Sequence, residues 1–147
     1  MLSKRIQVLS PSLTMAITSL ARDLKAQGRD VLSFSAGEPD FDTPQIVKDA
    51  AIAAINGGFS KYTAVAGTPE VLKAIAGKLK RENNLEYKPS DIVVNVGAKH
   101  SLFNIFQAII DDGDEVIIPA PYWVTYPEIV KYSGGEPVFI DTDETSG

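Results

Sequence analysis

Three stretches of the chain combine helical spacing of apolar residues with recognisable helix ends. Near the N-terminus the apolar positions recur every three or four residues, which predicts a helix over about 13–27, with Ser12 as its cap and Gly28 at its end. Two threonine-proline pairs give a similar signal further on, because proline at the first helical position loses no needed hydrogen bond. They predict helices over about 44–56 and 69–83.

Other stretches are continuously apolar or β-branched, a pattern typical of strands that are covered on both faces. The predicted strands are 31–35, 92–96, 115–119 and 137–141. Helical stretches, at about 99–110 and 123–133, separate the last three of them. Strands joined by helical crossovers lie parallel, so we expect βαβ units whose strands are buried on both faces.

This order of elements predicts an α/β protein with a mostly parallel sheet flanked by helices. The sequence ends a few residues after the last predicted strand, where a βα architecture normally continues. We therefore expect the architecture to be incomplete within these 147 residues.

Composition narrows the classes of function. The chain has no cysteine, which removes disulfides and thiolate chemistry and favours a cytoplasmic protein. Its net charge is -5 with scattered basic residues, so a nucleic-acid partner is not expected. No apolar run approaches the roughly 20 residues of a membrane span, and no pattern indicates a bound metal. We expect a soluble protein with a small-molecule ligand.

The first candidate for chemistry is the turn Val96-Gly97-Ala98-Lys99, where a predicted strand leads into a helix. Helix N-termini at the carboxyl edge of a parallel sheet present N–H groups that bind phosphate. The turn matches neither the dinucleotide fingerprint nor the P-loop pattern. A tight connection with nothing bound is the alternative interpretation.

Two further segments are predicted to follow strands. Trp123, the only tryptophan, stands in a loop after the third strand and can stack on a flat ligand or simply fill core volume. Gly37 lies in an acidic turn, where it can expose its backbone to a carboxylate or serve the turn alone. His100 lacks the partners of a nucleophilic or metal site, so we expect a solvated or helix-packing role.

Four separated motifs, in this order, resemble the class-I (fold-type-I) pyridoxal-phosphate-dependent aminotransferases, in particular the bacterial branch of aspartate aminotransferases. They are Ser35-Ala36-Gly37-Glu38-Pro39-Asp40-Phe41-Asp42-Thr43-Pro44, then Lys61-Tyr62-Thr63 with Gly67-Thr68-Pro69-Glu70, then Val96-Gly97-Ala98-Lys99, and Pro121-Tyr122-Trp123. The resemblance covers nearly the whole chain, but only the N-terminal portion of a family member. It implies the N-terminal part of the aspartate aminotransferase-like fold.

The resemblance also implies roles for individual residues. Gly37 would contact the substrate through its main chain, and Trp123 would stack on the pyridine ring of pyridoxal 5'-phosphate and border the substrate. Ala98 and Lys99 would donate backbone N–H groups to the cofactor phosphate. Tyr62 would reach the phosphate bound by the other subunit of a homodimer, unless it is an ordinary surface tyrosine.

Lys99 carries a second implied role. In the bacterial branch it resembles the lysine that pairs with the distal carboxylate of a dicarboxylic substrate, with Ser12 or Thr14 as a further contact. This favours aspartate or glutamate as amino donor. A solvated lysine in the first turn of a helix is the alternative.

The family order implies that residues 1–35 form an N-terminal arm and helix contributing to the small domain, and 36–147 the first part of the large cofactor-binding domain. It places the Schiff-base lysine beyond Gly147, so no catalytic lysine is expected in this chain and the chain alone is expected to be inactive. The complete enzyme would transfer an amino group between an amino acid and a 2-oxo acid. Alternatives are an aminotransferase of other substrate specificity (alanine, an aromatic amino acid or prephenate) or a non-catalytic fragment that binds a phosphorylated ligand or assembles with a partner.

Overall fold

The structure is a computed structural model that describes residues 2–143 and 145. The chain divides into two compact units. The first comprises the N-terminal stretch as far as Glu38 together with the chain from Gly97 onward, and the second is Pro39–Val96.

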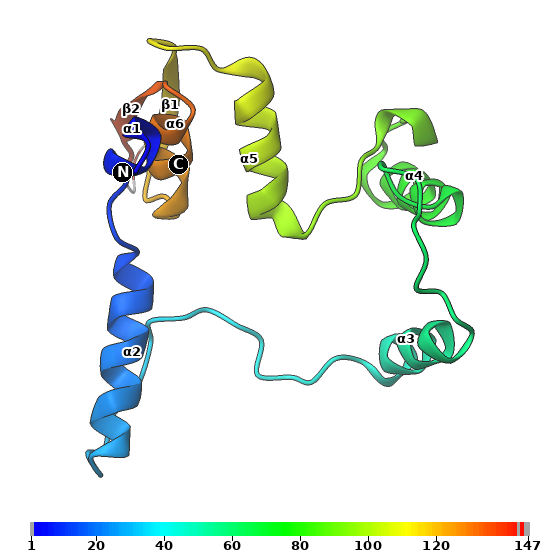
Figure 1. Ribbon diagram of the computed structural model, residues 1–147, viewed down its shortest axis with the longest axis horizontal. Coiled ribbons are helices and arrows are strands. Elements are labelled where there is room, and N and C mark those ends of the chain that lie inside the picture. Colours follow the sequence, from blue (N-terminus) through cyan, green and yellow to red (C-terminus); the bar gives the residue numbers. More distant parts are fainter. Residues whose placement is uncertain (1, 144, 146–147) are drawn as a thin grey trace. The chain divides into compact units, whose positions relative to one another are not determined.

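The first unit contains four helices and a two-stranded parallel sheet over its described residues (Figure 1). The helices are α1 (Lys4–Gln7), α2 (Leu13–Ala26), α5 (Gly97–Ile109) and α6 (Thr125–Tyr132), and the strands are β1 (Glu115–Ala120) and β2 (Glu136–Asp141). The register runs from Glu115 opposite Glu136 to Ala120 opposite Asp141. The βαβ unit predicted for the end of the chain is confirmed.

The ends of α2 follow from its sequence. The Ser12 side chain accepts a hydrogen bond from the Met15 N–H (3.4 Å), which satisfies one of the donors that a helix start leaves without a partner. Gly28 follows the last turn with a φ of +81°, a conformation that glycine adopts without strain. The helix predicted over 13–27 is therefore confirmed to within one residue.

The core of the first unit lies between α6 and the sheet. Ile118 of β1 and Ile129 and Val130 of α6 are buried, and Val130 has no exposed surface at all. Each such side chain stabilises the fold by about 1.5–3 kcal/mol through its burial. Ile117, the neighbour of Ile118 on the opposite face of β1, is 63% exposed. The expectation that these strands are buried on both faces is thus wrong for the described chain, because α6 covers only one face.

The second unit consists of α3 (Gln45–Asn56), α4 (Pro69–Asn83) and the short 3₁₀ helix η1 (Pro89–Asp91). Thr68 caps α4 by accepting from the Val71 N–H (3.4 Å), and Pro69 occupies the first helical position as predicted. Before α3, Pro44 stands at the cap position itself and makes no side-chain cap hydrogen bond. Both helices agree with the predicted ranges to within a residue.

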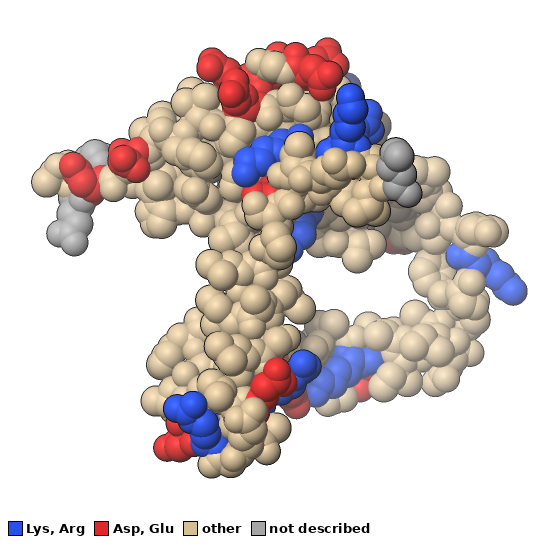
Figure 2. All heavy atoms as spheres, turned by 60° about the vertical axis from the view of Figure 1, so that its left-hand side comes forward, with Lys and Arg blue, Asp and Glu red and all other residues tan. Residues whose placement is uncertain are grey.

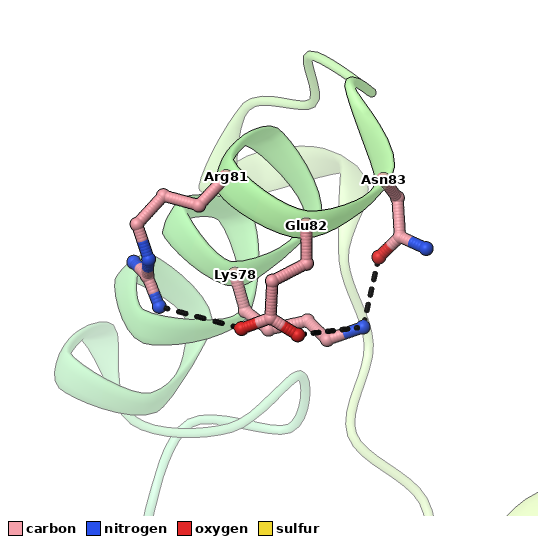
Figure 3. Close-up of polar contacts among 4 residues, drawn as sticks. All are labelled: Lys78, Arg81, Glu82 and Asn83. Atoms are coloured by element: carbon pink, nitrogen blue, oxygen red, sulfur yellow. Dashed lines mark hydrogen bonds and ion pairs between the residues drawn. The ribbon is translucent and has the colours of Figure 1, made fainter.

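Exposed polar contacts join the last turns of α4. Figure 3 shows Lys78 Nζ between a Glu82 carboxylate oxygen (3.5 Å) and Asn83 Oδ1 (2.8 Å), while Arg81 approaches the other Glu82 oxygen at 3.8 Å. Such exposed pairs contribute only about 0.3–0.5 kcal/mol each. The α4 helix also contacts η1, although none of its residues is buried.

Two predicted strands, 31–35 and 92–96, are wrong in the structure, which assigns no strand to either stretch. Residues 31–35 instead run beside the apolar face of α2, where they form one side of a groove of about 480 Å³. In the other stretch, the Val94 N–H donates to the Ala66 carbonyl (2.8 Å), which is a loop contact. A β-branched sequence alone does not make a strand, because a strand requires a neighbour to complete its ladder of hydrogen bonds.

No helix among the described residues is long and apolar enough to cross a membrane. On the face drawn in Figure 2, lysine and arginine occupy several separate places rather than one basic patch.

Candidate functional site

The turn into α5 has the backbone expected of an anion-binding helix start. Gly97 has a φ of +80°, in the left-handed region that favours glycine, and it leads directly into the helix. The N–H groups of the first turn, which include those of Ala98 and Lys99, have no partner within the helix itself. They point beyond its N-terminus, where the helix dipole is positive.

Trp123 lies next to this turn. The Lys99 Nζ atom is 5.7 Å from the centroid of the indole ring, within the range of a cation–π contact. Trp123 is 46% exposed, so one part of the residue packs on the protein and another part is open to a ligand. The structure therefore brings together the helix start and the indole, two features that the sequence placed on separate loops.

The loop that carries Trp123 is held by its neighbour. The Tyr122 ring stacks on Phe139 of β2, with ring centroids 4.9 Å apart and planes inclined by 20°. An offset stack of this kind adds about 0.5–1.5 kcal/mol to the burial of the two rings. Both rings belong to the βαβ unit, so the loop that carries Trp123 is attached to that unit.

A cavity of about 360 Å³ adjoins Lys99. Its lining includes Ser10–Leu13, Lys99, Tyr122, Val124, Thr125 and Glu128. Ser12 is thus on the same cavity as Lys99, as the resemblance implied for one of its two candidates. Thr14 lies just inside α2, and its carbonyl accepts a hydrogen bond from the Thr18 hydroxyl (2.8 Å).

Glu128 is the residue of this cavity that the sequence analysis missed. Its carboxylate accepts a hydrogen bond from the Ser10 N–H at 2.8 Å, although the two residues are 118 positions apart. Helical periodicity marks Glu128 only as a polar residue early in α6, and a contact with a backbone N–H leaves no trace in the side-chain pattern. No sequence signal points to this pairing.

Gly37 lies in an exposed, irregular stretch that follows residues 31–35. A Cβ atom built on it would meet nothing within 4 Å, so the described chain itself does not require a glycine there. Upstream, the Ser35 hydroxyl is hydrogen-bonded to that of Thr18 (3.1 Å), which ties this stretch to α2. The proposed contact of Gly37 with a substrate stays a prediction.

Tyr62 belongs to the second unit, in an irregular stretch between α3 and α4. Its side chain is fully exposed, and with Ser60 and Lys61 it lines a shallow depression of about 290 Å³. A fully exposed tyrosine offers an apolar ring and a hydroxyl to another molecule. Its role at a second subunit stays a prediction.

The residues around Lys99 suit a ligand that is both anionic and flat. The helix start provides N–H donors and a partial positive charge, and the ammonium group of Lys99 adds a full one. The half-exposed indole provides the flat apolar surface. This set of donors fits a phosphorylated aromatic ring such as pyridoxal 5'-phosphate.

Comparison with known proteins gives a consistent result. The model of the family described as aminotransferase class I and II matches residues 29–147. The chain is 58% identical over 141 residues to an aspartate/prephenate aminotransferase of Nitrosomonas europaea and 55% identical to an aspartate aminotransferase of Bacillus sp. strain YM-2. Each match covers 96% of this chain and 36% of the relative, so the chain spans little more than a third of their length.

Solved structures agree. The structure of aspartate aminotransferase from Thermus thermophilus with maleate superposes with a TM-score of 0.95 at 49% identity, covering 99% of this chain and 38% of that one. An aspartate aminotransferase from Rhizobium meliloti gives a TM-score of 0.93 at 48% identity. The resemblance and the fold class inferred from the sequence are confirmed.

Proposed function

Since the chain belongs to the aminotransferase class I and II family, we propose that the complete protein transfers an amino group between an amino acid and a 2-oxo acid with pyridoxal 5'-phosphate. By the complete protein we mean a polypeptide of the relatives' length that contains this chain. The observation that carries the proposal is the contact of Lys99 with Trp123 at the start of α5.

The residues of this chain bind and orient the cofactor. Ala98 and Lys99 donate their N–H groups to its phosphate, and the Gly97 turn lets the phosphate approach the backbone closely. Trp123 stacks on the ring and excludes water from one of its faces. When bound, the cofactor supplies an electron sink that stabilises the carbanion formed at the substrate α-carbon.

The substrate lies beside the same residues. Gly37 contacts its carboxylate through the main chain, while Trp123 borders it on the cofactor side. Neither group moves a proton in this proposal, because the family order places the Schiff-base lysine beyond Gly147. We accordingly expect the 147-residue chain by itself to transfer no amino groups.

A dicarboxylic amino acid, aspartate or glutamate, is the preferred donor in this proposal. Lys99 pairs with its distal carboxylate, and Ser12, which lines the same cavity, adds a hydroxyl. Relatives named aspartate aminotransferase support this preference. The Thermus thermophilus structure with maleate, itself a dicarboxylate, supports it further.

Tyr62 is proposed to complete the phosphate site of a second subunit, which makes the homodimer part of the active site. The full exposure of its side chain supports the idea, since a partner then has a whole ring to cover. The assignment of 1–35 to the small domain and of 36–147 to the large one, and a cytoplasmic location, likewise stay predictions.

Prephenate is the second candidate acceptor, because several relatives are named aspartate/prephenate aminotransferases. Prephenate and the dicarboxylic amino acids all carry carboxylates, so Lys99 pairs with either kind of substrate. The donor assay below and a parallel assay with prephenate show whether the protein uses prephenate as well as other 2-oxo acids or is restricted to one of them.

The test is a steady-state assay of the complete protein with aspartate, glutamate and alanine as donors and 2-oxoglutarate, oxaloacetate and prephenate as acceptors. We expect kcat/KM to favour aspartate or glutamate over alanine, and Lys99→Ala to lower it for aspartate by about 10- to 100-fold through loss of a charged contact. His100→Ala, the neighbouring change, is the matched control. If the unaltered protein uses alanine better than aspartate, the substrate preference fails.

A further inference from the structure

A carboxylate of α6 is hydrogen-bonded to the N-terminal segment, which also contacts α6 through α1. Glu128 Oε2 accepts from the Ser10 N–H at 2.8 Å, and Glu128 Oε1 contacts Lys131 Nζ at 3.1 Å. The Glu128 side chain is 25% exposed, which is less than any other side chain in the described ion pairs. Each of its two oxygens thus has its own donor; the contact with Lys131 is partly buried, and the hydrogen bond with Ser10 lies at the exposed surface.

The anchored residue, Ser10, is itself part of the lining of the cavity that Lys99 also lines. Pro11 follows Ser10 and restricts the backbone, and Ser12 then caps α2. The segment Ser10–Leu13 therefore has little freedom between its anchor on Glu128 and the first turn of α2. The hydrogen bond to Glu128 holds the end of this segment that precedes Pro11.

The charge of Glu128 fits an anchor better than a ligand group. Glu128 lines the same cavity as Lys99, and a carboxylate with unoccupied oxygens would repel an anionic substrate there. The Ser10 N–H and the Lys131 ammonium group occupy both oxygens and offset this charge. Lys99 is then the charged residue of the cavity lining that can pair with an anionic ligand.

We propose that Glu128 is a positioning residue that fixes the segment Ser10–Leu13 across the Lys99 cavity and thereby sets the affinity for the distal carboxylate of the substrate. The anchoring part stands on the described contacts alone. The substrate part rests on the proposed function, because it assumes that Lys99 and Ser12 bind that carboxylate.

The anchoring part is tested by hydrogen exchange of the complete protein, followed by mass spectrometry of a peptide that contains Ser10. Glu128→Ala removes the acceptor, and we expect the Ser10 amide to exchange about tenfold faster, as for loss of one charge-assisted hydrogen bond. Glu128→Gln keeps a carbonyl oxygen for the same N–H and should restore most of the protection. Unchanged exchange in Glu128→Ala would overturn the anchor.

The substrate part is tested by the kinetics of the same variants. We expect Glu128→Ala to raise KM for aspartate about tenfold with a smaller change in kcat, and to leave KM for alanine, which has no distal carboxylate, close to its original value. Glu70→Ala is the matched control, because it also removes a carboxylate from the first turn of a helix, but in α4. An equal rise of KM for both donors would overturn the positioning role.

The outcomes separate this proposal from the proposed function. If the unaltered protein transfers amino groups from neither aspartate nor alanine, the proposed function and the substrate part fail together, and the exchange measurement still decides the anchor. If the unaltered protein uses aspartate and Glu128→Ala binds it equally well, only the positioning role fails.

Discussion

The two units of the chain bury their apolar residues to very different degrees. In the first unit, β1, α6 and β2 enclose Ile118, Ile129 and Val130. In the second unit, no residue of Pro39–Val96, all of which the structure describes, is buried, and Val65 is fully exposed. A crossover helix that returns its chain to a neighbouring strand makes its own core, whereas amphipathic helices without such a partner leave their apolar faces open. The candidate site rests on the unit that has the core.

The largest expected effect comes from placing a charge in that core. Val130→Asp puts a carboxylate where the structure leaves no exposed surface, so we expect the free energy of unfolding to fall by about 3–5 kcal/mol. Val65→Asp makes the same change at a fully exposed position and should alter it by less than about 0.5 kcal/mol. Urea unfolding of the 147-residue chain, followed by Trp123 fluorescence, measures both. Equal losses would remove the distinction between the two units.

A smaller change in stability is expected when a glycine is replaced. Gly135 is needed for packing, whereas Gly37 is proposed to contact a ligand. A Cβ at Gly135 would lie 2.9 Å from Ile110 Cγ2 and 3.0 Å from the Asp114 carbonyl oxygen, so Gly135→Ala should cost about 1–3 kcal/mol of stability. The Cβ atom added by Gly37→Ala has no neighbouring atom within 4 Å, so this substitution should leave stability unchanged. Instead we expect Gly37→Ala to raise KM for the amino donor roughly tenfold, since the substrate loses its close approach to the backbone.

Thermal unfolding and steady-state kinetics of the two glycine variants in the complete protein provide the comparison. A Gly37→Ala variant with an unaltered KM would contradict the substrate role of Gly37. A Gly135→Ala variant of unaltered stability would show that the residues around α6 rearrange to accommodate the added methyl group at little cost in free energy.

The smallest effect belongs to the exposed ion pair between Lys80 and Glu86 in the second unit, whose atoms lie 2.7 Å apart. Their hydrogen bond and mutual attraction raise the pKa of Lys80 above its ordinary 10.5 and lower the pKa of Glu86 below its ordinary 4.5. The Glu86 contribution to stability is therefore complete above pH 4.5 and is lost as the pH falls through the folded-state pKa. The Lys80 contribution is complete below pH 10.5 and is lost as the pH rises through its folded-state pKa.

Titration of both side chains by nuclear magnetic resonance measures these shifts. We expect Glu86→Gln to return the pKa of Lys80 toward 10.5, with a barely measurable change in stability because the pair is exposed. Glu82→Gln, which removes the charge from the two ion pairs of Glu82 in Figure 3, should leave the pKa of Lys80 where it was. A Lys80 pKa that is insensitive to Glu86→Gln would contradict the pairing.

Local rules predicted the helices well. Caps at Ser12 and Thr68 and a proline at the first helical position act within a single turn, so the sequence contains all the information they require. Strands depend on a neighbour that local sequence does not identify. For this reason 115–119 and 137–141, which pair with each other, were predicted correctly, and 31–35 and 92–96 were not.

The candidate site was predicted in part for the same reason. Motif order pointed to Gly97, Lys99 and Trp123, and the structure brings the last two into contact. Glu128 could not be identified from the sequence, because its partner is the backbone N–H of Ser10, 118 positions away. The side-chain pattern carries no information about such a pairing.

The phosphate role of the α5 start is tested most directly with Ala98→Pro in the complete protein. Proline removes the Ala98 N–H but is tolerated in the first turn of a helix, and Ala98→Gly, which keeps the N–H, is the control. The measurement is the affinity for pyridoxal 5'-phosphate and for pyridoxal without phosphate, followed by quenching of Trp123 fluorescence. We expect Ala98→Pro to weaken binding of the phosphorylated form by about 10- to 100-fold and to leave that of pyridoxal unchanged. Equal effects on the two compounds, or no effect on either, would contradict a phosphate site at this turn.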